Sequence, residues 1–196
     1  MNEGRANVRD ALLEAAFLFV QSAAQLAGVR RIALVGSILR DRRSPKDVDL
    51  IVYIADDADL EDLAWAARRL QGRLQSQNRG ADVFLADEHG RYLGRTCPWK
   101  SCQPGLRVSC DALHCGRRRH LHDDLGTIRP ADSLIAAPPL DLWPVVVRRC
   151  RPPADVERLI SRLHEPHNRP VEPSAASRAL AGRAHRERHA ARQGAD

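Results

Sequence analysis

The chain has 196 residues, of which 43% are hydrophobic and 29% are charged, a balance that excludes a fibrous or wholly disordered protein. Its net charge of +6 is carried almost entirely by arginine, and this excess alone is weak evidence for nucleic-acid binding. No apolar run approaches the roughly 20 residues that a membrane-spanning helix needs. The stretch 11–20 contains Glu14 and lacks the small-residue cleavage pattern of a signal peptide, so we expect a cytoplasmic protein without membrane contact.

The first half of the chain is predicted to alternate between helices and strands. Apolar residues at helical spacing indicate an amphipathic helix over residues 8–27. Residues 32–35 and 48–54 are short, apolar and β-branched, as expected of buried strands. A second helix is predicted over 56–77, whose first turns are acidic and whose later turns are basic, and a third strand over 81–86. This order of elements predicts an α/β (α+β) fold.

The composition changes after this first part, and the change suggests four segments. Residues 1–90 form the predicted core. Residues 91–150 are rich in cysteine, proline and glycine and have too few apolar side chains for a core of their own, so we expect a small Cys-rich extension that binds zinc. Residues 151–164 are predicted to hold one short helix, and the basic Pro/Ala/Arg-rich tail, 165–196, is expected to be flexible.

Three acidic residues form the most informative pattern in the sequence. Residues two apart in a strand face the same side, so Asp47 and Asp49 present both carboxylates from one face while Val48 points into the core. Two carboxylates so close repel each other unless a cation lies between them, and Mg²⁺ is the usual cation for oxygen ligands. Asp82 lies in an otherwise apolar strand, where a lone acid is costly to bury. We therefore expect Asp82 to complete a magnesium site.

A turn precedes these acids and has the residues of a phosphate site. Gly36 allows close approach of the backbone, and the hydroxyl and amide of Ser37 can bind phosphate oxygens. Arg40 and Lys46, which lie between this turn and the acids, can neutralise a triphosphate. Together these residues predict an in-line displacement at phosphorus with two Mg²⁺ ions at the three carboxylates.

The runs Leu34–Ser37 and Asp47–Val52, followed by Asp82 on a later strand, resemble the DNA polymerase beta-type nucleotidyltransferase superfamily, and more narrowly its small bacterial nucleotidyltransferase-domain proteins. The resemblance spans about residues 8–87. It implies a nucleotidyltransferase fold, with a mixed sheet flanked by helices, and Mg²⁺-dependent transfer of a nucleoside monophosphate from an NTP such as ATP to a hydroxyl, with release of pyrophosphate. By position, it also implies that Gly36 and Ser37 contact the triphosphate and that the three acids bind metal. The acceptor stays open between a protein hydroxyl, a small molecule and an RNA end.

A second interpretation needs no catalysis. An Asp-x-Asp pair at a strand start is often a solvated edge, and a Gly-Ser turn is among the commonest loops. The chain would then be a catalytically silent nucleotidyltransferase-fold protein that binds nucleic acid or a protein partner through its zinc module and its arginines.

The zinc prediction depends on four cysteines, which are spaced C-x4-C-x7-C-x4-C. Four thiolates in a segment turned by prolines and glycine suit tetrahedral, structural Zn²⁺. The four cysteines are Cys97, Cys102, Cys110 and Cys115, and the histidines that could replace one of them are His114, His120 and His122. The remaining cysteine, Cys150, is expected to be a small buried hydrophobe.

Two charged runs follow the cysteines. Residues 117–119 are three consecutive arginines, which could grip a phosphate backbone, although a solvated loop is the more ordinary interpretation because aromatic side chains for base stacking are scarce nearby. Adjacent residues point apart on a strand, so the pair Asp123 and Asp124 is read as a helix start rather than as a metal site.

Overall fold

The computed structural model describes residues 3–40, 45–100, 102, 118–122, 124 and 138–165. Contacts divide the chain into two compact units, Met1–Leu163 and His164–Asp196, and nearly all of the described residues belong to the first. Several residues and segments named above lie outside the described residues: Arg117, His114, Asp123, Cys110, Cys115 and all but the first residue of the tail 165–196.

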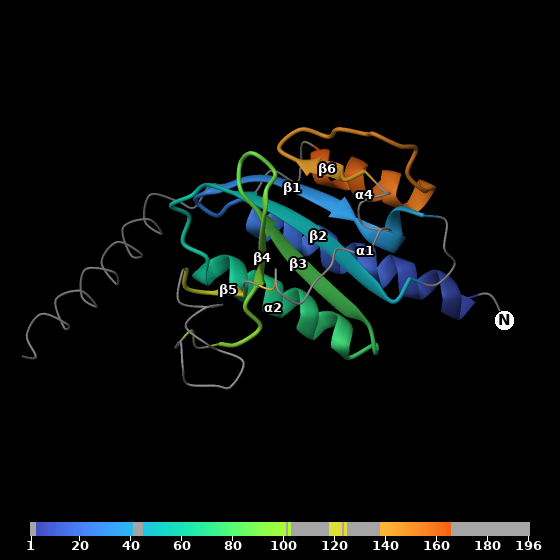
Figure 1. Cartoon of the computed structure of the whole chain (residues 1–196). Coiled ribbons are helices and arrows are strands. Elements are labelled where there is room, and N and C mark those ends of the chain that lie inside the picture. Colours follow the sequence, from blue (N-terminus) through green and yellow to red (C-terminus); the bar gives the residue numbers. More distant parts are fainter. Residues whose placement is uncertain are drawn as a thin grey trace, which may run out of the picture. The chain divides into compact units, whose positions relative to one another are not determined.

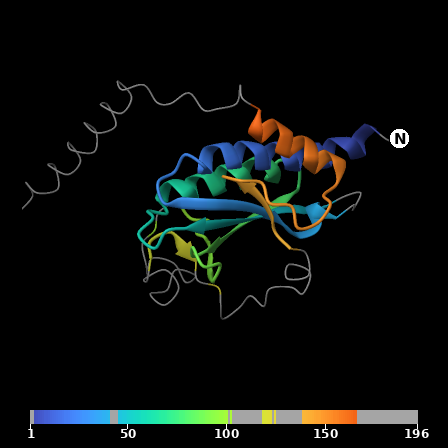
Figure 2. The ribbon, with the colours of Figure 1, turned by 90° about the horizontal axis from the view of Figure 1, so that it is seen from above.

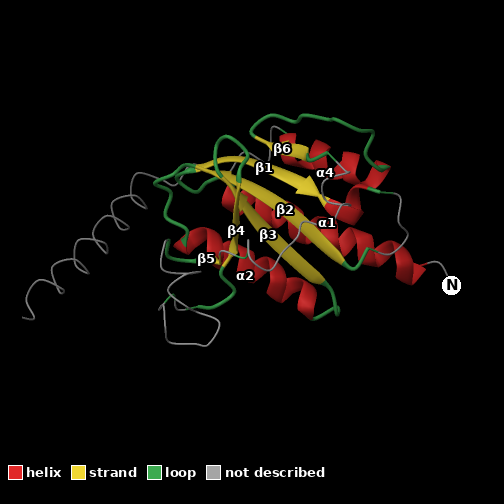
Figure 3. Cartoon of the chain, in the orientation of Figure 1, coloured by secondary structure: helices red, strands yellow, loops and turns green. Residues whose placement is uncertain are grey.

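A mixed sheet forms the centre of the first unit (Figures 1 and 3). Its order is β5 (Leu121–His122), β4 (Tyr92–Thr96), β3 (Gly80–Ala86), β2 (Asp47–Ile54), β1 (Val29–Val35) and β6 (Leu140–Trp143). β2 and β3 run parallel, and the other neighbouring pairs are antiparallel. The predicted α+β class is therefore confirmed, as a sheet of six strands.

The described α-helices all cover one face of this sheet (Figure 2). They are α1 (Glu3–Ala23), α2 (Glu61–Gln75) and α4 (Ala154–His164). In β2, Val48, Leu50 and Val52 are fully buried and join one core with residues of the three helices. Because side chains alternate along a strand, Asp47 and Asp49 project from the opposite face, which the described helices leave open.

The predicted bounds differ from the observed ones mainly at helix ends. The first helix stops at Ala23, before Gly28, which has a φ of 84°. The second helix begins at Glu61 rather than at residue 56, because Asp59 turns the chain and its carboxylate accepts a hydrogen bond from the Glu61 amide over 3.0 Å. The prediction that Cys150 is buried is wrong, since this residue is exposed.

The segment 91–150 contributes β4, β5 and β6 to the same sheet. These strands were not predicted, because two of them have only two and four residues and such short runs carry little periodicity. In the part of the chain that the structure describes, no helix combines the length and the apolar character needed to cross a bilayer.

Candidate active site

Strand register brings three acids together on the open face of the sheet. In the antiparallel pair β1·β2, Asp49 is opposite Val35, the last residue of β1, and in the parallel pair β2·β3 it is opposite Asp82. Paired residues of neighbouring strands project to the same face, and Asp47, two positions earlier, shares that face. The three predicted metal ligands therefore lie in one region, beside the turn that begins at Gly36.

The turn after β1 is a short 3-10 helix, Gly36–Leu39, in close contact with Asp49. Gly36 has a φ of 80°, in the region that residues with a Cβ seldom adopt. A Cβ at this position would lie 2.4 Å from Oδ2 of Asp49. The backbone of Gly36 and the carboxylate of Asp49 therefore touch, and only glycine allows this approach.

An ion pair between α1 and α4 supports the carbonyl groups of this turn. Arg9 of α1 donates hydrogen bonds to the carbonyls of Ile38 (3.0 Å) and Arg40 (3.3 Å), and it pairs with Asp155 of α4. Burial alone would raise the pKa of Asp155, but its hydrogen bonds and the charge of Arg9 outweigh burial and lower that pKa. Ser37 lies half-buried in this supported turn, and Arg40, whose amide donates to the Ser37 carbonyl, is exposed.

The electrostatics of the three acids centre on Asp49. Burial, together with the negative charges of Asp47 and Asp82, raises the pKa of Asp49 to about 7. A carboxylate with this pKa stays partly protonated at neutral pH unless a cation compensates the charge. The three acids therefore concentrate negative charge that a bound cation would offset.

This pKa predicts how cation binding depends on pH. A divalent ion must displace the proton of Asp49, so we expect the Kd for Mn²⁺, used as a spectroscopic substitute for Mg²⁺, to rise by up to about tenfold for each pH unit below 7 and to level off above it. Titration of the protein with Mn²⁺ at pH 5.5, 6.5 and 8, followed by the loss of free-ion EPR signal, checks this. A Kd that is equal at pH 5.5 and 8 would contradict it.

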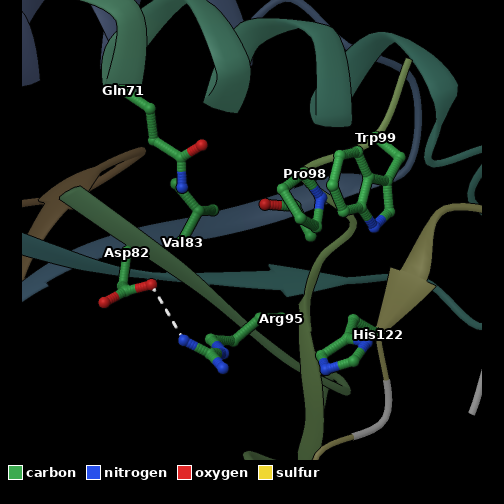
Figure 4. A pocket seen from close by; sticks show the side chains of 8 residues that line it. Gln71, Asp82, Val83, Arg95, Pro98, Trp99 and His122 are labelled. Carbon is green, nitrogen blue, oxygen red and sulfur yellow. Dashed lines mark hydrogen bonds and ion pairs between the residues drawn. The ribbon is translucent and has the colours of Figure 1, made fainter. Parts of the chain in front are cut away.

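Asp82 pairs with Arg95 (Figure 4), which belongs to a network that links three parts of the chain. Arg95 of β4 donates from Nη1 to Oδ1 of Asp82 (3.1 Å) and from Nε to Oδ2 of Asp124 (2.7 Å). Tyr92 donates its hydroxyl to Oδ1 of Asp124 (2.7 Å), whose side chain is fully buried. Burial alone would lower the pKa of Arg95, but the two carboxylates outweigh it and raise that pKa. Asp124 thus anchors an ion pair, a role that the sequence did not suggest.

The three acids have the right ligand atoms for a hard cation, but their side chains are not arranged around a common point. Their oxygens are the ligands that Mg²⁺ prefers. Among the described residues, however, no group of three or more His, Cys, Asp or Glu side chains is arranged so that it could hold a metal ion. Like charges repel in the absence of a cation, and one oxygen of Asp82 is bound to Arg95. Binding by all three acids would need their side chains to converge further.

A cavity of about 490 Å³ opens beside Asp47 and is rich in cationic and amide groups. Its lining is Lys46, Asp47, Gln75, Asn78, Arg79 and Gly80. Lys46 was predicted as a phosphate contact, but Arg79 was not, and among the described residues its buried Nε has no hydrogen-bond partner. The register Asp47 opposite Gly80 would have indicated Arg79, if the sequence had revealed that β2 and β3 run parallel.

Two of the four predicted zinc ligands lie in the described part of the chain. Cys97 and Cys102 are both buried thiols outside any disulfide. His120 lies between them: its amide donates to Sγ of Cys102 (3.0 Å), and its carbonyl accepts from the Cys97 amide (2.8 Å). Burial lowers the pKa of His120, and its buried Nδ1 has no hydrogen-bond partner among the described residues. His122 is half-buried on β5.

The basic run 117–119 is partly engaged within the protein. Arg118 donates from Nη2 to the carbonyls of Ala55 (3.1 Å) and Ala58 (2.5 Å). Burial lowers the pKa of this guanidinium, although the nearby acidic side chains oppose the shift. Arg118 therefore ties residues 118–122 to the loop before α2, and this contact competes with any role in gripping a phosphate backbone.

Comparison of the chain with family models, with curated proteins and with solved structures gives no match.

Proposed function

We propose that this protein is a Mg²⁺-dependent nucleotidyltransferase, which transfers a nucleoside monophosphate from an NTP to a hydroxyl acceptor and releases pyrophosphate. The observation that carries the proposal is the meeting of Asp47, Asp49 and Asp82 on one sheet face, with Asp49 touching the backbone of Gly36. A raised Asp49 pKa is what a site built to hold cations would have in their absence.

The cationic side chains near the acids support a polyphosphate substrate. Lys46 and Arg79 line the cavity beside Asp47, and their charge would offset that of an NTP. Ser37 and the exposed Arg40 lie in the turn next to Asp49. The cavity and the turn therefore offer the triphosphate cationic groups and the hydroxyl of Ser37.

In the reaction, Asp47, Asp49 and Asp82 would hold two Mg²⁺ ions once their side chains converge, and the bound ions would neutralise charge at the phosphates and lower the pKa of the attacking hydroxyl. The acceptor oxygen forms a bond to the α-phosphorus while the bond from this phosphorus to the bridging oxygen breaks. Pyrophosphate leaves with the bond electrons, and the hydroxyl proton passes to Asp82 as base. Arg95 orients Asp82 through its contact with Oδ1.

The test is direct transfer of label. Purified protein is incubated with Mg²⁺ and each of the four NTPs labelled at the α-phosphate, with and without cell lysate. The expected result is Mg²⁺-dependent labelling of an acceptor that the Asp47→Asn/Asp49→Asn variant does not produce. Absence of both labelling and Mg²⁺-dependent NTP binding in the intact protein would overturn the proposal and leave the catalytically silent alternative.

We also propose a structural zinc site, which the spacing of Cys97, Cys102, Cys110 and Cys115 supports. An amide that donates to a cysteine sulfur, as His120 does to Cys102, is a contact that stabilises a thiolate ligand. We expect close to one zinc per chain after gentle purification, and a loss of stability when a chelator removes it, because zinc binding contributes roughly 10 kcal/mol or more in such modules. Metal analysis by mass spectrometry checks this, and less than about 0.3 equivalents would contradict it.

A further inference from the structure

A second cavity, of about 250 Å³, lies beside Asp82 at the edge of β3. β4 pairs with β3 only from Phe84 to Ala86. The first half of β3 therefore has β2 on one side and, among the described residues, no ladder partner on the other. The side chain of Gln71 reaches from α2 and donates to the carbonyl of Ala81 over 3.1 Å. The cavity begins where the strand pairing stops.

The walls of this cavity combine an apolar surface with a few polar groups (Figure 4). Pro98 and Trp99, which follow β4, form the apolar wall, and Trp99 keeps 39% of its surface exposed. Gln71 and Asp82 lie on the other side of the cavity, and His122 of β5 lies on the same side as Trp99. A flat aromatic wall faced by hydrogen-bonding groups is typical of a site for a small ring.

The charges of this cavity exclude two kinds of occupant. Among the described residues, the ionisable side chains that line it are His122, Asp82 and Arg95; the last two are bonded to each other, and Arg95 is also bonded to Asp124. A phosphate would need cations whose charge is not already balanced, and a polycation would need several carboxylates. The cavity beside Asp47, with Lys46 and Arg79, is the one suited to anions.

We propose that the cavity beside Asp82 is the acceptor site and that it takes a neutral ring whose hydroxyl is presented to Asp82. This inference rests on the proposed function, since it assigns the acceptor of that reaction. The ring packs on Trp99 and Pro98, and Gln71 lies where it can offer a hydrogen bond to the polar edge of the ring. The hydroxyl oxygen is then the atom that bonds to the α-phosphorus, as set out above.

A planar neutral ring with a hydroxyl nearby can come from a tyrosine side chain, whose hydroxyl is on the ring, or from a nucleoside, whose hydroxyls are on the ribose, and small probes distinguish the two. We would measure binding of N-acetyltyrosinamide, adenosine and the ringless N-acetylserinamide to the full chain by saturation-transfer NMR without NTP, and then label transfer to each probe with Mg²⁺ and NTP. We expect one of the two ring probes, and not N-acetylserinamide, to bind and to accept label.

Two tryptophans of equal exposure provide matched variants. Trp65 on α2 is also 39% exposed, but it does not line the cavity. We expect Trp99→Ala to weaken binding of the ring probe by about tenfold, Trp99→Phe to restore most of it, and Trp65→Ala to leave it unchanged. Circular dichroism of each variant shows whether the fold is retained. If Trp99→Ala does not fold, comparison of Trp99→Phe with Trp65→Ala, measured with the three probes, still tests the acceptor assignment.

The outcomes separate this inference from the proposed function. If the protein binds NTP with Mg²⁺ but neither ring probe binds better than N-acetylserinamide, the acceptor assignment is overturned and the transferase proposal stands. Equal loss of ring binding in the Trp65→Ala and Trp99→Ala variants would also overturn the assignment. If NTP binding itself is absent, both fail.

Discussion

Replacing Asp49 by asparagine is expected to stabilise the metal-free protein while it removes cation binding. The Asp49 carboxylate is half-buried beside Asp47 and Asp82, and these surroundings raise its pKa to about 7. Because the folded pKa lies above the unfolded value, ionisation of Asp49 opposes folding. This destabilisation is absent near pH 4, grows as the pH rises, and is complete above about 7. At pH 8 we expect Asp49→Asn to raise the free energy of unfolding by about 1–2 kcal/mol.

Thermal unfolding in the presence of a chelator measures this effect. A gain of that size corresponds to an increase of about 2–8 °C in Tm at pH 8, and the gain should shrink toward pH 4. The same variant should bind Mn²⁺ at least about 100-fold more weakly. Asp10→Asn, at an exposed position of α1, is the control that should change neither quantity. A lower Tm for Asp49→Asn at pH 8 would mean that the carboxylate stabilises the fold, against this account.

Substitution of Gly36 by alanine is expected to damage both stability and the site. The φ of 80° costs a residue with a Cβ about 1–2 kcal/mol, and the new Cβ would lie 2.4 Å from Oδ2 of Asp49. Either the turn or the carboxylate has to move. We expect a loss of about 2–4 kcal/mol in the free energy of unfolding, together with weaker Mn²⁺ binding, measured by urea unfolding and by EPR titration.

Gly72 offers a matched control for this substitution. It lies within α2, and a Cβ there would meet nothing within 4 Å. Gly72→Ala should therefore stabilise the protein by about 0.5–1 kcal/mol, because alanine loses less conformational freedom in a helix. A Gly36→Ala variant as stable as the wild type would show that the turn adapts, and the close contact with Asp49 would then not be required.

The candidate site could be predicted in part because some of its signals are local. The two-residue period of a strand placed Asp47 and Asp49 on one face, and the isolation of Asp82 among apolar neighbours marked it as unusual. The partners of these acids could not be predicted in the same way. Arg95 contacts Asp82 and is itself held by Asp124, but these residues belong to no motif, and their contacts depend on which strands pair and in which register.

The ion pair that supports the turn at residues 36–40 also depends on contacts between distant segments. Arg9 and Asp155 are separated by 146 positions, and nothing in either neighbourhood indicates that they meet beneath residues 36–40. Helix α4 reaches α1 because Val156, Leu159 and Ile160 join the common core, and such burial is decided by the whole fold. The short strands β5 and β6 also depend on long-range contacts, since they are defined by their pairing with β4 and β1.

By itself, the sequence determined the order of the main helices and strands, the α+β class and the shared face of Asp47 and Asp49. These features follow from hydrophobic periodicity and turn residues, which are local properties of the chain. The tertiary structure alone decided that β2 and β3 run parallel with Asp49 opposite Asp82, that Arg95 holds Asp82, and that cavities of different charge open beside Asp47 and Asp82. These features arise from register and packing between distant segments, which no local pattern encodes.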